Sequence, residues 1–307
     1  MKTGTRSKPI LLGGLAVFVA ILVGYWFSTR PSPNEPVSRG RTLTEWLERL
    51  DDGEAFGISS DSLPSSTPRQ AEAAEAIRAL GAEALPSLLR DIHASPCEKE
   101  FRFRIERQLN SIVGRLTGGR TIFFSDVTRE DRVRWRAAQG MAALGPMASP
   151  AIPELSRLLF TNYFHSSIKE AAFVLAAIGP SGVAILTNAV ESQAEWSAMC
   201  AIWALGQHPA AGTNAISTFI AATPSPSEGV SCGAIQVLGL FHCQGPRVIP
   251  ALVAALERSN AAVRRDAVRA LGAFGAEAVE ALPRLHPLTN DPALRTEALE
   301  ALKKIRQ

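Results

Sequence analysis

Residues 260–285 read NAAVRRDAVRALGAFGAEAVEALPRL. Asn260 is a residue type that caps helix N-termini. The apolar residues after it recur at helical spacing and share one face: Val263, Ala267, Ala270, Leu271 and Phe274. Gly272 and Gly275 are expected to end this helix, because glycine tolerates left-handed backbone angles. Pro283 then fits the start of a second helix, where its missing N–H breaks no helical hydrogen bond. The stretch therefore predicts a helical hairpin.

The Ala-Leu-Gly of this hairpin recurs, with small variations, along most of the chain. The marker glycines lie at positions 81, 114, 145, 179, 206, 239 and 272, and their successive spacings are 33, 31, 34, 27, 33 and 33 residues. A nearly fixed period of this size is typical of helical hairpins that stack on one another. We therefore predict an all-α fold, a right-handed α-solenoid of about seven hairpins over residues 69–307, with an insertion at about residues 116–130.

The stretch from Asn260 to Gly272, followed by Ala281-Leu-Pro-Arg-Leu285, resembles a HEAT repeat in the short HEAT-like form also found in phycobilisome lyases. With the apolar segment near the N-terminus and Thr42-Leu-Thr-Glu-Trp-Leu47, the layout is similar to bacterial membrane-anchored HEAT-repeat proteins. The period is shorter than the roughly 40–47 residues usual for HEAT repeats. The resemblance implies stacked helices and, in its lyase form, a tetrapyrrole-related activity.

Residues 10–27 read ILLGGLAVFVAILVGYWF, a run without a charge. As a helix this run would span about 27 Å, close to the thickness of a bilayer core. Tyr25 and Trp26 at one end suit the membrane interface. A cleavable signal peptide is the alternative, but its apolar region is normally shorter and ends in a small-residue cleavage site. We predict an uncleaved transmembrane signal anchor at residues 10–27.

Charges beside this segment predict its orientation. Lys2, Arg6 and Lys8 precede it, and the positive-inside bias keeps such a terminus cytoplasmic. We therefore expect a cytoplasmic N-terminus at residues 1–9, a single pass through the inner membrane, and a repeat domain that is periplasmic or otherwise exported. Two copies of the predicted span could associate along a row of small residues, formed by Ala16, Ala20 and Gly24.

Between the predicted span and the repeats, the sequence predicts two linkers and one short helix. Residues 28–41 are Pro-rich and suggest an extended spacer, and residues 52–68 suggest a flexible connection. In the helix expected at residues 42–51, Thr42 and Glu45 have the spacing of a capping box. Its apolar stripe, Leu43, Trp46, Leu47 and Leu50, suits either a cap on the first hairpin or a docking helix for another protein.

The charge balance excludes a nucleic-acid footprint. The chain carries a formal net charge of +3, but four basic residues and no acid lie within residues 1–30, which leaves residues 31–307 at −1. Proteins that bind nucleic acid concentrate Lys and Arg on one face. We therefore expect no nucleic-acid partner.

No motif for catalysis or cofactor binding is present in the sequence. It has neither a Walker phosphate-binding loop nor a G-x-S-x-G elbow, and no histidine is followed by glutamate. Cys232, His242 and Cys243 could be drawn as a metal cluster, but structural zinc sites need four ligands at tight spacing. Cys200 and Cys232 lie about one repeat apart, and buried free thiols are the interpretation favoured over a disulfide. We predict no metal, no cofactor and no enzymatic activity.

The predicted insertion lies in the most basic part of the chain. Residues 101–136 hold nine arginines and four acidic residues, with Ile122, Phe123 and Phe124 in an otherwise polar run. One interpretation is a solvated basic face with the phenylalanines folded under it. The other is a loop that grips an acidic partner or a phospholipid surface. Its candidate partner-binding residues are Ile122, Phe123, Phe124, Arg102, Arg104, Arg132, Arg134 and Trp135.

These patterns together predict a membrane-tethered scaffold for protein–protein interactions, because a solenoid exposes a long surface to partners. The partner is another protein, whose identity the sequence leaves open. An enzyme or enzyme subunit of the HEAT-like lyase type is the first alternative function. A structural envelope protein is the second.

Overall fold

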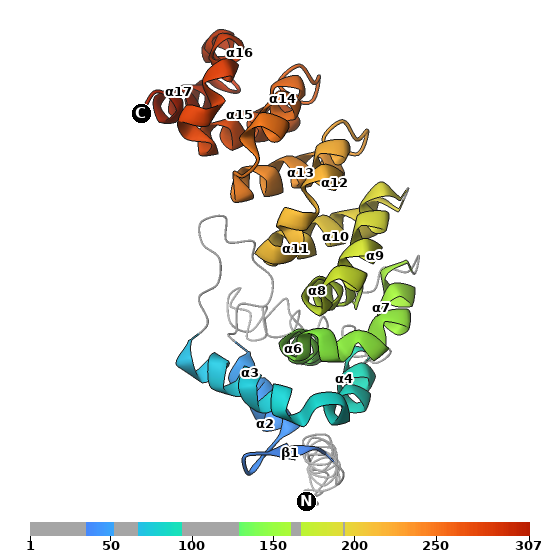
Figure 1. Cartoon of the computed structure of the whole chain (residues 1–307). Coiled ribbons are helices and arrows are strands. Elements are labelled where there is room, and N and C mark those ends of the chain that lie inside the picture. The colour runs from blue at the N-terminus through green and yellow to red at the C-terminus, as the bar shows by residue number, and fades with distance from the viewer. Residues whose placement is uncertain (1–34, 52–66, 94–128, 161–166, 193) are drawn as a thin grey trace, which may run out of the picture.

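The computed structural model describes residues 35–51, 67–93, 129–160, 167–192 and 194–307. The apolar segment at residues 10–27, the small-residue row Ala16, Ala20 and Gly24, and most of the predicted insertion lie outside these ranges. Within them the chain is a series of paired helices (Figure 1). The pairs are α3 (Pro68–Leu80) with α4 (Leu85–Ile92), α6 (Arg129–Leu144) with α7 (Ile152–Leu159), α8 (Ser167–Ile178) with α9 (Pro180–Glu191), α10 (Glu195–Gln207) with α11 (Pro209–Asn214) and α12 (Ile216–Ala222), α13 (Glu228–Phe241) with α14 (Gly245–Ala255), and α15 (Ala261–Ala273) with α16 (Leu282–Leu285), followed by α17 (Arg295–Ile305).

The hairpins stack in chain order. The first helices α6, α8, α10, α13, α15 and α17 each pack on the next one. Figure 1 shows them along the inner side of a curved stack, with the second helices α4, α7, α9, α12 and α14 along the outer side. Small and branched apolar residues fill the space between consecutive helices, as Leu175, Ala201, Leu205 and Leu271 do at 0% exposure. The prediction of an all-α solenoid built from helical hairpins is confirmed.

The ends of the first helices differ in one respect from the prediction. Asn260 caps α15 as expected, because its Oδ1 accepts hydrogen bonds from the amides of Ala262 (2.8 Å) and Val263 (3.3 Å). Gly275 has the expected left-handed backbone, with φ of +54°. Gly272, however, lies inside α15 rather than at its end. A Cβ there would lie 3.1 Å from the Cα of Ala301, so Gly272 serves the close approach of α15 and α17.

The stacking order also departs from the one that the marker glycines predict. The hairpin of Gly81 packs directly on α6, the first helix of the Gly145 hairpin. The guanidinium Nε of Arg78 donates to the carbonyl of Ala143 (3.0 Å), and a Cβ on Gly140 would lie 3.0 Å from the Leu88 side chain. No further hairpin separates these two in the stack. The predicted hairpin at position 114 lies outside the described residues.

A short β-hairpin at residues 37–42 precedes the first helix pair, and residues 28–34 of the predicted spacer lie outside the described residues. Strand β1 (Val37–Ser38) pairs antiparallel with β2 (Arg41–Thr42) through a turn at residues 39–40, both with positive φ. The indole Nε1 of Trp46 donates to the carbonyl of Ser38 (2.9 Å). This bond ties the β-hairpin to the helix that follows it.

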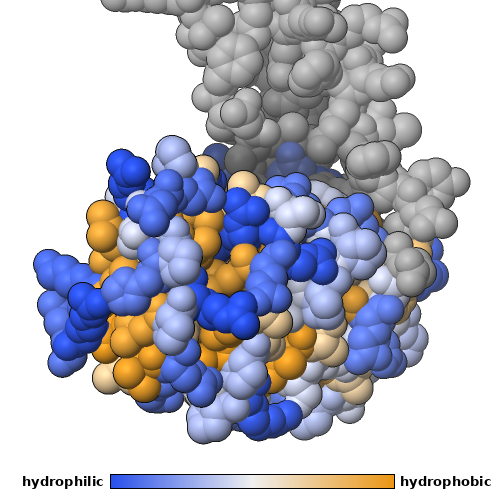
Figure 2. All heavy atoms as spheres, turned by 90° about the horizontal axis from the view of Figure 1, so that it is seen from above, coloured by the Kyte–Doolittle hydropathy of each residue, from blue (hydrophilic) through white to orange (hydrophobic). Residues whose placement is uncertain are grey.

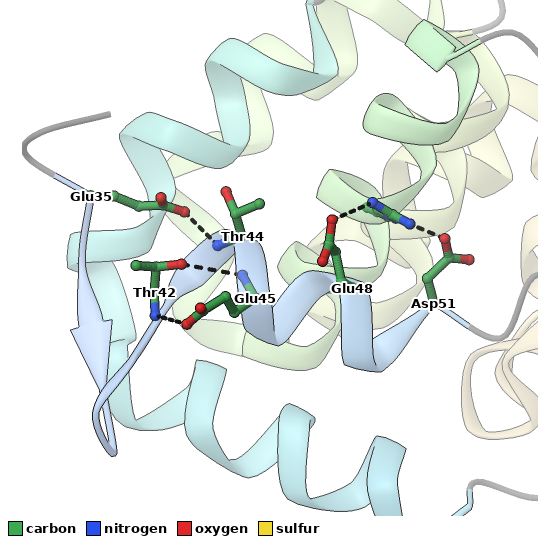
Figure 3. Close-up of polar contacts among 7 residues, drawn as sticks. Glu35, Thr42, Thr44, Glu45, Glu48 and Asp51 are labelled. Carbon is green, nitrogen blue, oxygen red and sulfur yellow. Dashed lines mark hydrogen bonds and ion pairs between the residues drawn. The ribbon is translucent and has the colours of Figure 1, made fainter. Parts of the chain in front are cut away.

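That helix, α2 (Leu43–Leu50), covers the N-terminal end of the described stack. The predicted capping box is confirmed: the Thr42 side chain accepts from the Glu45 amide, and the Glu45 carboxylate accepts from the Thr42 amide at 2.9 Å (Figure 3). Arg136 on α6 reaches Asp51 at 2.7 Å and Glu48 at 3.4 Å. The face with Leu43, Trp46 and Leu47 is buried against α3 and α6. This packing agrees with the cap rather than the docking helix.

The predicted location in the inner membrane is corrected. Among the residues that the structure describes, no helix is long and apolar enough to cross a bilayer. The longest of these, α6, has 16 residues and carries several charges, whereas a span needs about 20 mostly apolar residues. The structure therefore gives no support for a single-pass anchor.

Seen from above, the C-terminal end of the stack shows hydrophobic residues among charged ones (Figure 2). Two large apolar side chains of the last elements are well exposed, Val279 at 59% and Leu299 at 54%.

Candidate functional site

The predicted partner-binding residues fall into two groups. Ile122, Phe123, Phe124, Arg102 and Arg104 lie outside the described residues. Arg132, Arg134 and Trp135 lie on α6, where only Arg132 is exposed. Arg134 is buried and pairs with the Asp131 carboxylate, and Trp135 is 7% exposed. Arg134 and Trp135 are thus packed inside the structure rather than exposed to a partner.

Trp135 belongs to an aromatic cluster built by three consecutive first helices. Its ring centroid lies 4.9 Å from that of Phe173 on α8 and 6.2 Å from that of Trp203 on α10. Phe173 and Trp203 are 5.9 Å apart, and the His208 ring lies 4.8 Å from Phe173 on the other side. Trp135 and Trp203 come from helices with α8 between them, yet their rings meet. The first helices therefore line a concave side of the stack, which we call the inner face.

A cation lies against this cluster. The Lys169 ammonium is 4.3 Å from the centre of the Trp203 ring, a distance typical of a cation–π contact. Burial lowers the pKa of Lys169, and the nearby Glu170 acts in the opposite direction. Burial also raises the pKa of the neighbouring Cys200 thiol to about 12. Cys200 is therefore protonated at neutral pH and unsuited to act as a nucleophile or a metal ligand.

Several polar atoms of the cluster are buried without a hydrogen-bond partner. They are the indole Nε1 of Trp203, the amide Oε1 of Gln139 and the ring Nε2 of His208. Burial lowers the pKa of His208, while a hydrogen bond with the Phe173 backbone opposes that shift. The ring is thus held neutral around pH 7. Unsatisfied buried groups are rare in native proteins and often mark functional regions.

A further aromatic residue, Trp196, lies at the start of the same helix as Trp203, α10. It is 57% exposed and lies seven residues before Trp203, which places both on one side of the helix. Beside it, α13 carries Gly229 opposite Met199, where a Cβ would lie 2.6 Å from the Met199 sulfur. We call Trp135, Phe173, Trp196 and Trp203, with the half-buried Met199, the aromatic face.

The sequence around this face is poor in charge. No Lys or Arg occurs between Lys169 and Arg247, and the acidic residues after Glu170 in that stretch are only Glu191, Glu195 and Glu228. The Glu195 carboxylate is bonded by the Ser227 hydroxyl, and that of Glu228 by the Asn260 amide at 2.8 Å. Cores of protein interfaces are depleted in charge and enriched in aromatic residues. The aromatic face has this composition.

The repeat register contained a signal for this face. Trp135 and Trp196 both lie ten residues before a marker glycine, Phe173 lies six before, and Trp203 lies three before. These offsets fall on one side of a helix. Aligning the hairpins on their glycines would have shown that aromatic residues collect at the inner-face positions of three neighbouring hairpins.

The described residues contain no cluster of three or more side chains suited to a metal ion. Cys200, Cys232 and Cys243 are free thiols, and Cys97 lies outside the described residues. Burial and the neighbouring Asp266 carboxylate raise the pKa of Cys232 to about 12.

The comparisons with known proteins concern the C-terminal hairpins most directly. The family pattern described as HEAT repeats matches residues 216–303. No curated protein matches the chain in sequence.

Solved structures resemble the chain at low sequence identity. An engineered protein from the Northeast Structural Genomics Consortium is 17% identical over 86% of this chain and 96% of its own, with a TM-score of 0.42. A designed armadillo repeat protein in complex with the peptide (KR)4 is 19% identical over 59% of this chain and 100% of its own, with a TM-score of 0.39. Kap121p is 13% identical over 86% of this chain and 29% of its own, with a TM-score of 0.45. The chain is thus a stack of helical hairpins, of which residues 216–303 match the pattern of HEAT repeats.

Proposed function

We propose that the protein is a scaffold for protein–protein interactions, without catalytic activity of its own, and that the aromatic face is its docking surface. The observation that carries this proposal is the exposure of Trp196, 57%, in a stretch of chain that holds no Lys or Arg from residue 170 to residue 246. An exposed tryptophan is the residue type that dominates binding energy at interfaces.

The composition of the face indicates the chemistry of the partner. A nucleic acid would need Lys and Arg to neutralise its phosphates, and none lies between Lys169 and Arg247. An acidic peptide would need the same groups. The matching partner is a protein segment without strong net charge that presents apolar side chains, since burying these against Trp196 and Met199 leaves no charge unpaired.

Site-specific photo-crosslinking in the native cell tests the docking surface. We expect p-benzoylphenylalanine at position 196 to give a discrete crosslinked protein after irradiation. The same group at position 188, an exposed residue of α9 on the outer side, is the matched control and is expected to give none. Equal crosslinking at both positions, or none at position 196, would contradict the proposal.

A pair of alanine variants then separates binding from folding. Trp196→Ala should leave the melting temperature within about 2 °C of wild type, because most of the ring is already in water, and should remove the co-purifying partner. Val279→Ala, at a similarly exposed position at the C-terminal end, should change neither property. Retention of the partner by Trp196→Ala with unchanged stability would exclude the aromatic face as the docking surface.

A further inference from the structure

Glu170 is an acidic residue in the middle of the packed stack. It lies on α8, which packs between α6 and α10, and its exposure is 0%. Both carboxylate oxygens are buried, and neither accepts a hydrogen bond from another residue. An ionised carboxylate in such a place loses its hydration without replacement, which is among the most unfavourable arrangements in a protein interior.

The charged and titratable groups around Glu170 do not supply that replacement. Across α6 the nearest are Arg134 and Asp131, which bond each other. On α8 itself the ammonium of Lys169 lies over the Trp203 ring. On α10 the neighbour is the Cys200 thiol, which is itself held protonated by burial. The two cations attract the carboxylate from a distance, but neither donates a hydrogen bond to it.

Removal from water is therefore the dominant influence on this acid. It raises the pKa of Glu170 from 4.5 to about 7, and a hydrogen-bonding interaction with the Glu170 backbone and the attraction of Arg134 and Lys169 only partly oppose the rise. At neutral pH the side chain is divided between its neutral and ionised forms. The neutral acid suits a buried position far better than the anion does.

We propose that Glu170 is a pH-dependent weak point of the solenoid: as a neutral acid it lets α8 pack between α6 and α10, and on losing its proton it loosens that packing. This pH-dependent weak point at Glu170 does not depend on the proposed function. It concerns the hairpins that carry Trp135, Phe173 and Trp203, so proton loss would change the part of the stack on which the aromatic face is built.

The direction of the pH effect follows from linkage. Between pH 4.5 and about 7 the folded state holds the Glu170 proton and the unfolded state has lost it. Stability contributed by this group therefore falls as pH rises through that window and is level above about 7. Glu170→Gln keeps the shape of the neutral acid and cannot ionise, so its stability should lack this fall.

Urea unfolding of the full chain and of Glu170→Gln, measured from pH 5 to pH 8.5, tests the proposal. We expect the folding equilibrium constant of Glu170→Gln, divided by that of the wild type, to rise by roughly a hundredfold between pH 5 and pH 7.5. Each unit of pKa shift changes the folding equilibrium constant by about tenfold. A ratio that is constant with pH would overturn the proposal. Glu297→Gln on α17 is the matched control, because Glu297 is ion-paired and should give no such rise.

Two measurements on the wild-type chain do not depend on the variant folding well. Carbon-13 NMR of the Glu side-chain carboxyl carbons should show one group that titrates near pH 7, and titration of every Glu below pH 5.5 would overturn the proposal. Hydrogen exchange, corrected for its intrinsic pH dependence, should show protection lost in α8 between pH 6 and pH 8 but kept in α15. Equal changes in both helices would contradict a local weak point.

Discussion

The hairpins of α6, α8 and α10 and those of α13, α15 and α17 share one repeat pattern but present different inner faces. In the first group the inner positions are aromatic, and rings from three helices touch. In the second group they are polar: Gln236 donates to Asp266 at 2.9 Å, and Glu297 accepts from Arg265 and Arg269. The HEAT-repeat pattern matches residues 216–303, which contain the polar group.

The repeat fixes the contacts between helices and leaves the inner face free to vary. Apolar residues such as Leu205 and Leu271 are buried at equivalent places in both groups, one residue before the marker glycine. The inner-face positions point away from these contacts. Selection can therefore change them without disturbing the stack, which is how a repeat architecture acquires a binding surface.

The largest expected effect comes from breaking the shared contact. Leu271→Asp places an unpaired charge at a site that is 0% exposed, and we expect a loss of about 4 kcal/mol or more of unfolding free energy. Thermal unfolding followed by circular dichroism measures it.

Leu299→Asp is the matched control for this change. Leu299 is 54% exposed on α17, so the same substitution should alter the unfolding free energy by less than about 0.5 kcal/mol. Similar losses for the two variants would show that the stack does not depend on the buried leucine row.

The sequence predicted the fold well where local rules act alone. Asn260 and the Thr42–Glu45 pair cap helices as their residue types require. It failed where contacts distant in the chain decide. The sequence pattern predicts a helix end at Gly272, but the glycine is needed there because Ala301 of the next helix packs closely against it. The direct packing of the Gly81 hairpin on α6 likewise depends on Gly140 and Leu88, which the period does not report.

The marker glycines offer a second, smaller effect that differs between the two groups. At Gly239 a Cβ would lie 2.9 Å from the Cα of Ala270, a backbone atom that cannot rotate away. At Gly206 the nearest atom is a methyl of Val237, at 3.0 Å. We expect Gly239→Ala to lose about 2–3 kcal/mol and Gly206→Ala about 1 kcal/mol, both by urea unfolding. The reverse order would show that the two interfaces are packed differently from the geometry described.

The candidate site was less predictable than the fold. The arginines and aromatic residues of positions 101–136 drew attention by composition, yet Arg134 and Trp135 are buried among neighbouring helices. Trp196 and Trp203 stand alone in the sequence and become a surface only when α8 and α10 are stacked. Glu170 has the same character, because a lone Glu in a helix reads as exposed until its neighbours are known.

The aromatic cluster supplies a third comparison, between two phenylalanines. Phe173 touches the rings of Trp135, Trp203 and His208, whereas Phe274 has no ring contact among the described residues. Replacing either by Leu loses a similar apolar volume, and ring pairs add about 0.5–1.5 kcal/mol beyond burial. We expect Phe173→Leu to lose about 1 kcal/mol more than Phe274→Leu in urea unfolding. Equal losses would show that the ring contacts add no stability beyond that of ordinary apolar packing.

The smallest expected effect lies in the polar inner face. Glu297 is 17% exposed and accepts from Arg265 at 3.4 Å and Arg269 at 3.0 Å, whose side chains are 38% and 61% exposed. Water screens such pairs, so Glu297→Gln should lose only about 0.5 kcal/mol at low salt. In 0.5 M NaCl, where the screening length falls to about 4 Å, the difference from wild type should nearly vanish. A loss above about 2 kcal/mol that persists in salt would mean that this carboxylate behaves as a buried charge. The side chains of the polar inner face would then contribute to the unfolding free energy as strongly as those of the aromatic inner face. The two faces would differ in residue type but not in their contribution to stability.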